Sequence, residues 1–235
     1  MIDFTRQTLL VVAPHPDDEI FGCGGLMYRV KKEGGKVFVL YLTVGTTQDF
    51  SRSGLSTEDE RVREIKRVVK KMRIDDYRIA FPGNEHHLQL DHLPQKALID
   101  EIERGELSLE KLRPTILAFP SSYDYNQDHR AANTACITAT RPVSGNFKHT
   151  PQLLLEYEYP AVGWSPLSGP SPNFFLALDE KSLSAKLDSL TLYASQMKVK
   201  KGPISLYGAE TLARMRGIQS GTDHAEAFNA RRLVT

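Results

Sequence analysis

The residues best suited to chemistry are an imidazole and two carboxylates near the start of the chain. His15 and Asp18 lie three residues apart, with Asp17 and the backbone-restricting Pro16 between them. A second cluster, Asp128–His129, follows far along the chain. One aspartate and two histidines form a donor set that suits Zn²⁺, and three protein ligands leave a fourth position for water. Bound zinc lowers the pKa of that water to about 7, so that a neighbouring carboxylate such as Asp17 can accept its proton.

Each of these residues also has a simpler interpretation. An acidic residue before a helix is most often a cap, and this applies to Asp18. His129, taken alone, is more often a structural histidine than a ligand. The metal hypothesis depends on a coincidence, because both clusters follow apolar strands and both begin helices. Spacing alone leaves the two interpretations open.

The segments that must position these clusters alternate between strand and helix patterns. Residues 8–13 are apolar at nearly every position, which is typical of a strand covered on both faces. The further predicted strands are 36–44, 77–81, 115–119, 152–157 and 174–178, and the predicted helices are 19–33, 58–72, 93–104, 130–141, 181–195 and 207–218. This alternation predicts an α/β fold with a mostly parallel sheet and helices on both faces. Ligands of such sheets bind at the carboxyl ends of the strands, where both clusters lie.

Composition indicates an ordinary globular protein. The chain has 235 residues, 40% hydrophobic and 25% charged, and we interpret residues 1–235 as one domain whose C-terminal third extends the fold and lines the cleft. A net charge of +1 does not indicate nucleic acid or an anionic membrane as partner. We find no signal peptide, and no apolar run reaches the ~18 residues of a membrane-spanning helix. Cys23 and Cys136 form no metal or redox motif, so a cytoplasmic location is expected.

Two other groups of residues are chemically suited to a site but have simpler interpretations. The helix that opens at Ser56–Thr57 carries basic residues along one face: Arg61, Arg63, Lys66, Arg67, Lys70 and Lys71. We interpret this run as a solvated helix face. His86 and His87 would point to opposite faces of a strand, so we interpret them as residues of the surface or of a substrate rim.

A resemblance to a known family adds to this picture. Residues 13–19, Ala-Pro-His-Pro-Asp-Asp-Glu, resemble the signature of the PIG-L (LmbE-like) N-acetylglucosaminyl de-N-acetylases, in which a later Asp-His pair follows. Residues 61–72, 186–196 and 225–228 resemble further segments of that family, so the resemblance covers most of the chain. It implies a Rossmann-like fold and metal-dependent hydrolysis of an N-acetyl group from an amino sugar.

The resemblance also implies roles for individual residues. His15, Asp18 and His129 would be zinc ligands, and Asp17 would be the general base that activates the zinc-bound water. Iron or another divalent metal would also suit this donor set. The substrate would be a small N-acetylated amino sugar or its conjugate, of unspecified aglycone. The chain has no evident membrane anchor, and the sequence is compatible with a homo-oligomer.

Three further positions are expected around this site. Asp128 would orient a ligand or an active-site imidazole, and Arg61 would contact substrate. Many relatives have a histidine where this chain has Asn126, whose amide can only donate a neutral hydrogen bond. The proton donor is therefore open between Asp17 and a histidine elsewhere.

Two rival functions remain to be weighed against the de-N-acetylase. Asn126 keeps open a sugar-binding module that retains the pocket without catalysis. A Mg²⁺-dependent phosphoryl hydrolase would also use carboxylates after a first strand, but His15 and the lack of a Walker-type loop argue against it.

Overall fold

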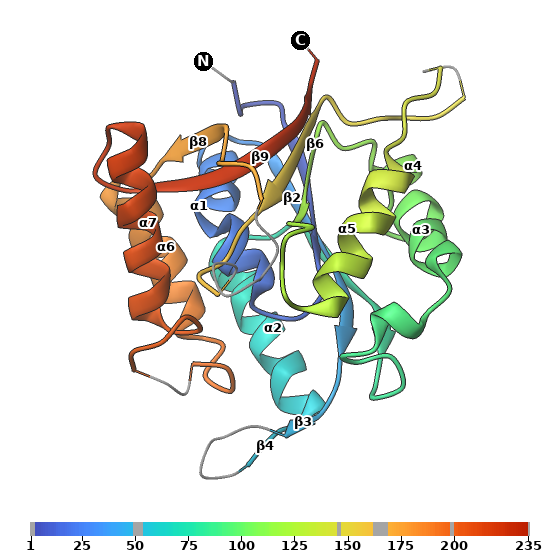
Figure 1. The fold of residues 1–235 in the computed structure, drawn as a ribbon, viewed down its shortest axis with the longest axis horizontal. Helices are drawn as coiled ribbons and strands as arrows, with labels where there is room; N and C mark the ends of the chain where they lie inside the picture. The colour runs from blue at the N-terminus through green and yellow to red at the C-terminus, as the bar shows by residue number, and fades with distance from the viewer. Residues whose placement is uncertain (1–2, 49–53, 145–146, 162–168, 198–199, 235) are drawn as a thin grey trace.

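A computed structural model describes residues 3–48, 54–144, 147–161, 169–197 and 200–234 (Figure 1). The strands of its main sheet are β1 (Thr8–Ala13), β2 (Lys36–Val44), β5 (Asp76–Pro82), β6 (Ile116–Pro120), β7 (Leu153–Tyr157), β8 (Phe174–Ala177) and β9 (Ala225–Leu233). The helices are α1 (Asp18–Lys32), α2 (Glu58–Met72), α3 (Gln95–Arg104), α4 (Leu109–Leu112), α5 (Gln127–Ala139), α6 (Glu180–Leu190) and α7 (Leu206–Ser220), with a 3₁₀ turn η1 (Leu90–His92). Strands β3 (Thr47–Gln48) and β4 (Leu55–Ser56) pair separately.

The main sheet has seven strands among the described residues, in the order β5-β2-β1-β6-β7-β9-β8. The first five of these are parallel to one another, whereas β9 runs antiparallel to both β7 and β8. The predicted mostly parallel sheet is therefore confirmed. The chain leaves β1 for β2 on one side and returns to β6 on the other, so a topological switch point lies beside β1, where such folds bind ligands.

Strand β1 is buried on both faces because each face meets its own layer of helices. Leu9, Val11 and Ala13 belong to a core shared with α1, α2, α6 and α7. Leu10 and Val12 face the opposite core, which α3 and α5 complete. Figure 1 shows these two helical layers on either side of the sheet. The prediction of helices on both faces is confirmed, and it follows from the alternating side chains of a fully apolar strand.

Most element boundaries agree with the predictions within a few residues, and the departures have local causes. Helix α5 begins at Gln127 because the side chain of Asn126 caps it, accepting from the Asp128 N–H at 2.9 Å. Helix α6 ends at Leu190, earlier than predicted. Strand β9 was not predicted, because its second half alternates poorly between apolar and polar residues.

A buried ion pair connects the C-terminal third to α1. Lys186 Nζ donates to the carbonyl oxygen of Phe21 and to Glu226 Oε1, both at 2.7 Å. The two carboxylate oxygens of Glu226 accept from the N–H groups of Gly25 and Leu26, at 2.7 and 2.8 Å. In a regular helix the Phe21 carbonyl would accept from the Gly25 N–H. Here Lys186 donates to that carbonyl and Glu226 accepts from that N–H. A Cβ atom on Gly25 would lie 2.4 Å from the Leu178 side chain and 3.0 Å from the Glu226 carboxylate, which explains the glycine.

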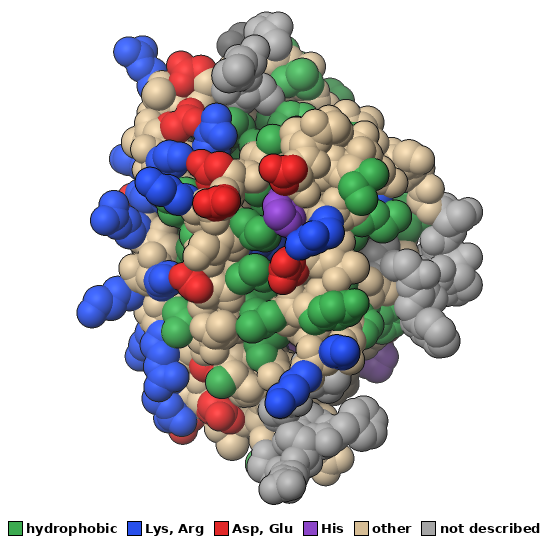
Figure 2. All heavy atoms as spheres, turned by 90° about the vertical axis from the view of Figure 1, so that its left-hand side faces the viewer, with side chains coloured by type: hydrophobic (Ala, Val, Ile, Leu, Met, Phe, Trp, Pro, Cys, Tyr) green, Lys and Arg blue, Asp and Glu red, His purple; other side chains and the backbone are tan. Residues whose placement is uncertain are grey.

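The face on which α6 and α7 lie carries side chains of both charge signs (Figure 2). Basic side chains gather along one edge of this face, and acidic side chains lie beside them. Exposed ion pairs such as Lys71–Asp188, at 3.2 Å, join α6 to its neighbours. Within the described ranges, no helix is both long enough and apolar enough to cross a bilayer. The expectation that nucleic acid and membranes are not partners stays a prediction.

Candidate active site

The loop between β1 and α1 contains the first cluster and holds it in a constrained conformation. Strand β1 ends at Ala13, and the N–H of Thr43 on β2 donates to the Pro14 carbonyl at 3.0 Å. Asp17, the N-cap of α1, has a φ of 108° and is only 8% exposed. A residue other than glycine rarely adopts positive φ, and such positions cluster at functional sites.

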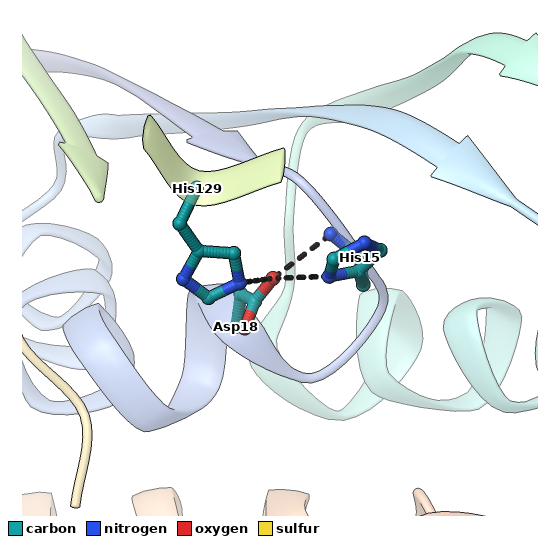
Figure 3. Close-up of side chains that lie close together, drawn as sticks. All are labelled: His15, Asp18 and His129. Carbon is teal, nitrogen blue, oxygen red and sulfur yellow. Dashed lines mark hydrogen bonds and ion pairs between the residues drawn. The ribbon is translucent and has the colours of Figure 1, made fainter. Parts of the chain in front are cut away.

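His15, Asp18 and His129 converge on one point although they come from two segments distant in the chain, the start of α1 with its preceding loop and the start of α5 (Figure 3). Asp18 Oδ2 lies 3.3 Å from His15 Nδ1 and 3.2 Å from His129 Nε2, and it also accepts from the His15 backbone N–H at 2.9 Å. All three side chains are buried, and their candidate ligand atoms lie within 4.8 Å of one another. The structure therefore brings together the three residues that the sequence suggests as metal ligands.

Each of the two histidines is oriented by its own carboxylate. Asp128 Oδ2 lies 2.9 Å from His15 Nε2, and Asp124 Oδ2 lies 2.7 Å from His129 Nδ1. Because these carboxylates accept from the far nitrogen of each ring, the near nitrogens face Asp18 and would offer their lone pairs to a bound cation. Asp128 thus lies where the sequence suggests an orienting residue. Asp124 was not predicted as a site residue. The only indication in the sequence is that it lies shortly before His129.

The electrostatic environment of this group favours a cation. Burial opposes ionisation of Asp18, yet His129 and His15 hold its pKa below the usual range of a carboxyl. Burial also opposes protonation of His129, yet Asp18 and Asp124 raise its pKa to about 10. At this point the attraction of the carboxylates for positive charge exceeds the cost of burying that charge. A divalent ion would balance the charge of the carboxylates just as the protons do. Together with the nitrogen and oxygen donors, this charge balance fits a metal such as zinc.

Asp17 and Glu19 are buried carboxyl groups beside the metal-ligand candidates. Burial and the charge of Asp18 raise the pKa of Asp17 well above its ordinary value, and Arg61 opposes this shift. Burial raises the pKa of Glu19 to about 7, against hydrogen bonds from Tyr193 and Tyr41. A carboxyl with a raised pKa is better suited to take up and return a proton near neutral pH.

Arg61 is buried and lines the same cavity as Asp17, so its assignment to a solvated helix face is wrong. The Arg61 side chain lies in the first turn of α2 and is only 4% exposed, whereas the rest of the basic run is exposed: Arg63, Lys66, Arg67, Lys70 and Lys71. Helix α2 starts after β2, at the same sheet edge as the loop of Asp17. The first turn of α2 therefore directs the Arg61 guanidinium toward the carboxylates, whereas the later turns of the helix lie away from the site.

His87 is also part of the interior, and the surface or rim interpretation is wrong for it. Its exposed fraction is 5%, and its ring meets that of His15 edge-on, with centroids 5.6 Å apart. Arg61 Nη1 lies 2.9 Å from His87 Nε2, and because a guanidinium only donates, that nitrogen accepts. Burial, Arg61 and His15 lower the pKa of His87 to about 3. His87 is therefore a neutral ring whose Nε2 receives a hydrogen bond.

The cavity above these residues has a volume of about 170 Å³. Its polar side includes the metal-ligand candidates, Asp17, Arg61 and Asn126. Tyr159, Gln196 and Ile204 form part of its wall. The C-terminal third thus lines the cleft, as the sequence predicts. The ring centroids of Tyr159 and His129 are 5.3 Å apart.

Fold and site together define a Rossmann-like protein with a group able to hold a metal at the carboxyl edge of its sheet. Residues 10–140 match the PIG-L family, described as GlcNAc-PI de-N-acetylase, and the chain belongs to this family. The family expected from the Ala13–Glu19 motif is therefore confirmed.

Individual relatives agree with this membership. The chain is 24% identical over 191 residues to the uncharacterized deacetylase YaiS of Escherichia coli K12, covering 81% of this chain and 92% of that protein. It is 26% identical over 230 residues to the diacetylchitobiose deacetylase of Thermococcus kodakarensis, covering 94% and 82%. Among solved structures, the conserved protein TT1542 of Thermus thermophilus superposes with a TM-score of 0.73 at 26% identity, covering 100% and 97%.

Proposed function

We propose that this protein is a metal-dependent hydrolase that removes an N-acetyl group from an amino-sugar substrate. The observation that carries the proposal is the buried His15–Asp18–His129 group, which lies beside Asp17 at the switch point of the sheet. The family description and the diacetylchitobiose deacetylase among the relatives support an N-acetylated sugar as the substrate class.

The donor set would hold the metal through His15 Nδ1, Asp18 Oδ2 and His129 Nε2. Zinc suits these nitrogen and oxygen ligands, and three protein ligands are typical of catalytic rather than structural zinc. When bound, the ion supplies Lewis acidity toward water and the amide carbonyl. Asp124 and Asp128 would keep both imidazoles in the tautomer that binds a cation.

Asp17 is assigned as the group that moves the proton. Its buried carboxylate borders the cavity and takes a proton from the attacking water. Two other candidates for returning a proton to the amine are already engaged, since His87 Nε2 accepts from Arg61 and the Asn126 side chain caps α5. We therefore assign the return of the proton to Asp17 as well, since it holds one after the attack.

Arg61 is assigned to substrate binding. Its Nη1 is directed at His87 and Thr47, at 2.9 and 3.2 Å, which fixes the guanidinium plane against the cavity. Arg61 also lines the cavity together with Asp17. A fixed guanidinium next to the reacting carboxylates can bind the hydroxyl or carbonyl oxygens of a sugar.

The proposal is tested by measuring acetate release. Protein stripped with a chelator and then reloaded with zinc, iron or manganese is incubated with N-acetylglucosamine and N,N′-diacetylchitobiose. We expect acetate and free amine in equal amounts from the reloaded protein and none from the stripped protein. Sugar binding without acetate would indicate a binding module, and phosphate-ester hydrolysis restored by Mg²⁺ alone would indicate a phosphoryl hydrolase.

A further inference from the structure

Glu19 is a buried carboxyl group directly behind Asp17, and it does not border the cavity. Its exposed fraction is 0%. Glu19 Oε2 accepts from the Asp17 backbone N–H at 3.0 Å. Glu19 Oε1 accepts from the hydroxyl of Tyr193 at 2.5 Å and from that of Tyr41 at 3.1 Å. Both tyrosines are fully buried, so the carboxyl is held from two sides inside the protein.

These contacts act on a backbone position that needs support. Asp17 has a φ of 108°, a conformation that is unfavourable for any residue with a Cβ. Such a conformation persists only when its surroundings fix it, and the Asp17 N–H is held by Glu19. The direction of the Asp17 side chain follows from this backbone conformation. The aim of the carboxylate at the cavity therefore depends on an acceptor at position 19.

The two tyrosines attach this acceptor to distant parts of the fold. Tyr41 comes from β2, and Tyr193 lies just after α6. Two residues beyond Tyr193, the N–H and hydroxyl of Ser195 donate to the Glu64 carboxylate of α2, at 2.7 and 2.6 Å. The acceptor at position 19 is thus anchored by a rigid strand and by a segment that is itself bonded to α2.

We propose that Glu19 is a positioning residue, which keeps Asp17 in its left-handed conformation and so aims the general base without touching the substrate. This inference rests on the role proposed for Asp17. It requires an oxygen that can accept the Asp17 N–H. Glutamine at position 19 still provides one such oxygen and can donate its NH₂ to the tyrosine hydroxyls, whereas methionine of similar length provides neither.

The kinetic test compares Glu19→Met with Glu19→Gln in the full-length, metal-loaded protein. A misplaced catalytic group reduces turnover strongly, so we expect Glu19→Met to lower kcat about ten- to hundredfold with KM and metal content nearly unchanged. Glu19→Gln should recover most of that loss. Glu103→Met, which removes another buried carboxylate far from the cavity, is the control and should leave kcat within about twofold.

A double-mutant cycle separates positioning from general damage. If Glu19 acts through Asp17, then Glu19→Met should have less than about a twofold effect on kcat in an Asp17→Asn background. Equal losses in both backgrounds, or equal losses from Glu19→Met and Glu19→Gln, would overturn the proposal. Full activity of Asp17→Asn alone would instead contradict the proposed general base.

A measurement independent of activity keeps the inference testable whatever the substrate proves to be. Hydrogen exchange of the Asp17 amide, followed by NMR, should accelerate at least about tenfold in Glu19→Met but not in Glu103→Met. Tyr193→Phe, which keeps the carboxyl but removes one of its supports, should give a smaller acceleration and serves if Glu19→Met does not fold. Unchanged exchange in both position-19 and position-193 variants would overturn the proposal.

Discussion

Asp124 and Asp128 act on the candidate site without lying among the three metal-ligand candidates. Each accepts a hydrogen bond from the outer nitrogen of one imidazole, and each also bonds the backbone: Asp124 accepts from the Asn126 N–H and Asp128 from the Leu90 N–H, both at 2.9 Å. Such partners fix the ring orientation and raise the basicity of the ligand nitrogen. The affinity for a metal at this site would therefore depend on the loop that follows β6 as well as on the ligands.

Asp124→Asn should weaken metal binding. The amide is neutral and a weaker acceptor for His129 Nδ1–H, so we expect the Kd for zinc to rise about 10- to 100-fold. Competition with a chromophoric chelator measures this constant. Asp91→Asn, at an exposed position, is the control. An unchanged Kd in Asp124→Asn would contradict the orienting role.

Asp17→Asn should separate metal binding from turnover. The amide cannot accept a proton from water, so turnover should fall by ~10²–10⁴-fold, the usual contribution of a general base. Metal content, measured by elemental analysis, should stay near full because Asp17 is outside the donor set. Asp59→Asn on the exposed side of α2 is the matched control. Wild-type turnover in Asp17→Asn would remove this residue from the mechanism.

The buried neutral ring of His87 should make stability fall in mild acid. Its pKa is about 3 in the folded protein and 6.5 in an ordinary environment, so only the unfolded chain takes up this proton between those values. The stabilisation is complete above pH 6.5 and is lost as the pH falls toward 3. In that window the free energy of unfolding should decline by about 1.4 kcal/mol per pH unit more in the wild type than in His87→Gln.

Denaturant unfolding of the metal-free protein over this pH range measures the difference. The glutamine side chain can still accept from Arg61, so the substitution mainly removes the titrating group. His92→Gln changes an exposed histidine and serves as the control. Parallel pH profiles for the wild type and His87→Gln would contradict the assignment.

Sequence patterns located the residues of the site unequally. His15, Asp18 and His129 could be found because they stand in short polar motifs that follow apolar strands and lie at the starts of helices. Arg61 belongs to a run of six basic residues, and its periodicity does not distinguish it from the others; only the family resemblance marks it as a site residue. His87 follows a turn after β5, and its burial depends on Arg61 and His15, which come from other segments. Such positions depend on tertiary packing, which periodicity does not encode.

At the scale of elements, α1 depends on partners from the end of the chain. Lys186 and Glu226 are 4% exposed, and together they bond the backbone of α1 at Phe21, Gly25 and Leu26. Removing one member of a buried pair leaves an uncompensated charge, which typically destabilises by about 3–5 kcal/mol. The orientation of α1, and with it the loop of Asp17, is therefore linked to α6 and β9.

Lys186→Met should lower the free energy of unfolding by about 3–5 kcal/mol, because Glu226 then keeps an unpaired charge in the interior. Urea unfolding of the metal-free protein measures the change. Lys32→Met is the matched control, because Lys32 pairs with Asp179 at 3.0 Å on the exposed surface and should contribute less than about 1 kcal/mol. Equal losses in the two variants would contradict the importance of the buried pair.

Element types were largely predictable from sequence, whereas some ends and the strands β3, β4 and β9 were not. Strand β2 matches its predicted bounds because an apolar run ends at glycines on both sides. Helix α5 starts earlier than its apolar pattern because a polar cap, Asn126, sets its beginning. The later half of β9 carries polar and basic residues, and its strand form comes from pairing with β7. Local sequence patterns do not predict backbone pairing between segments that are distant in the chain.

For the whole molecule, the position of the site beside β1 means that a metal held there would join segments remote in sequence. The β1–α1 loop supplies His15, the first residue of α1 is Asp18, and the first turn of α5 supplies His129. An ion bound to all three would hold the two halves of the parallel sheet together at the switch point. Unfolding must then release the ion, so ligand binding adds to global stability.

Zinc should raise the melting temperature of the stripped protein. At a free concentration 100 times Kd, linkage adds about 2.7 kcal/mol, which corresponds to a rise of roughly 5–10 °C for a chain of this length. Differential scanning calorimetry with and without metal measures the shift. His129→Ala should lose most of it, while Asp59→Asn should keep it. No shift in the wild type would contradict the metal site.

The bonds between Glu226 and α1 also have a consequence for synthesis. Residues 25 and 26 leave the ribosome about 200 residues before their carboxylate partner is made. Until position 226 emerges, those two amides lack the carboxylate that they bond in the folded protein. The nascent chain should therefore fix the loop of Asp17 only after position 226 has been made, and a ribosome-stalled product that stops before β9 should be catalytically silent.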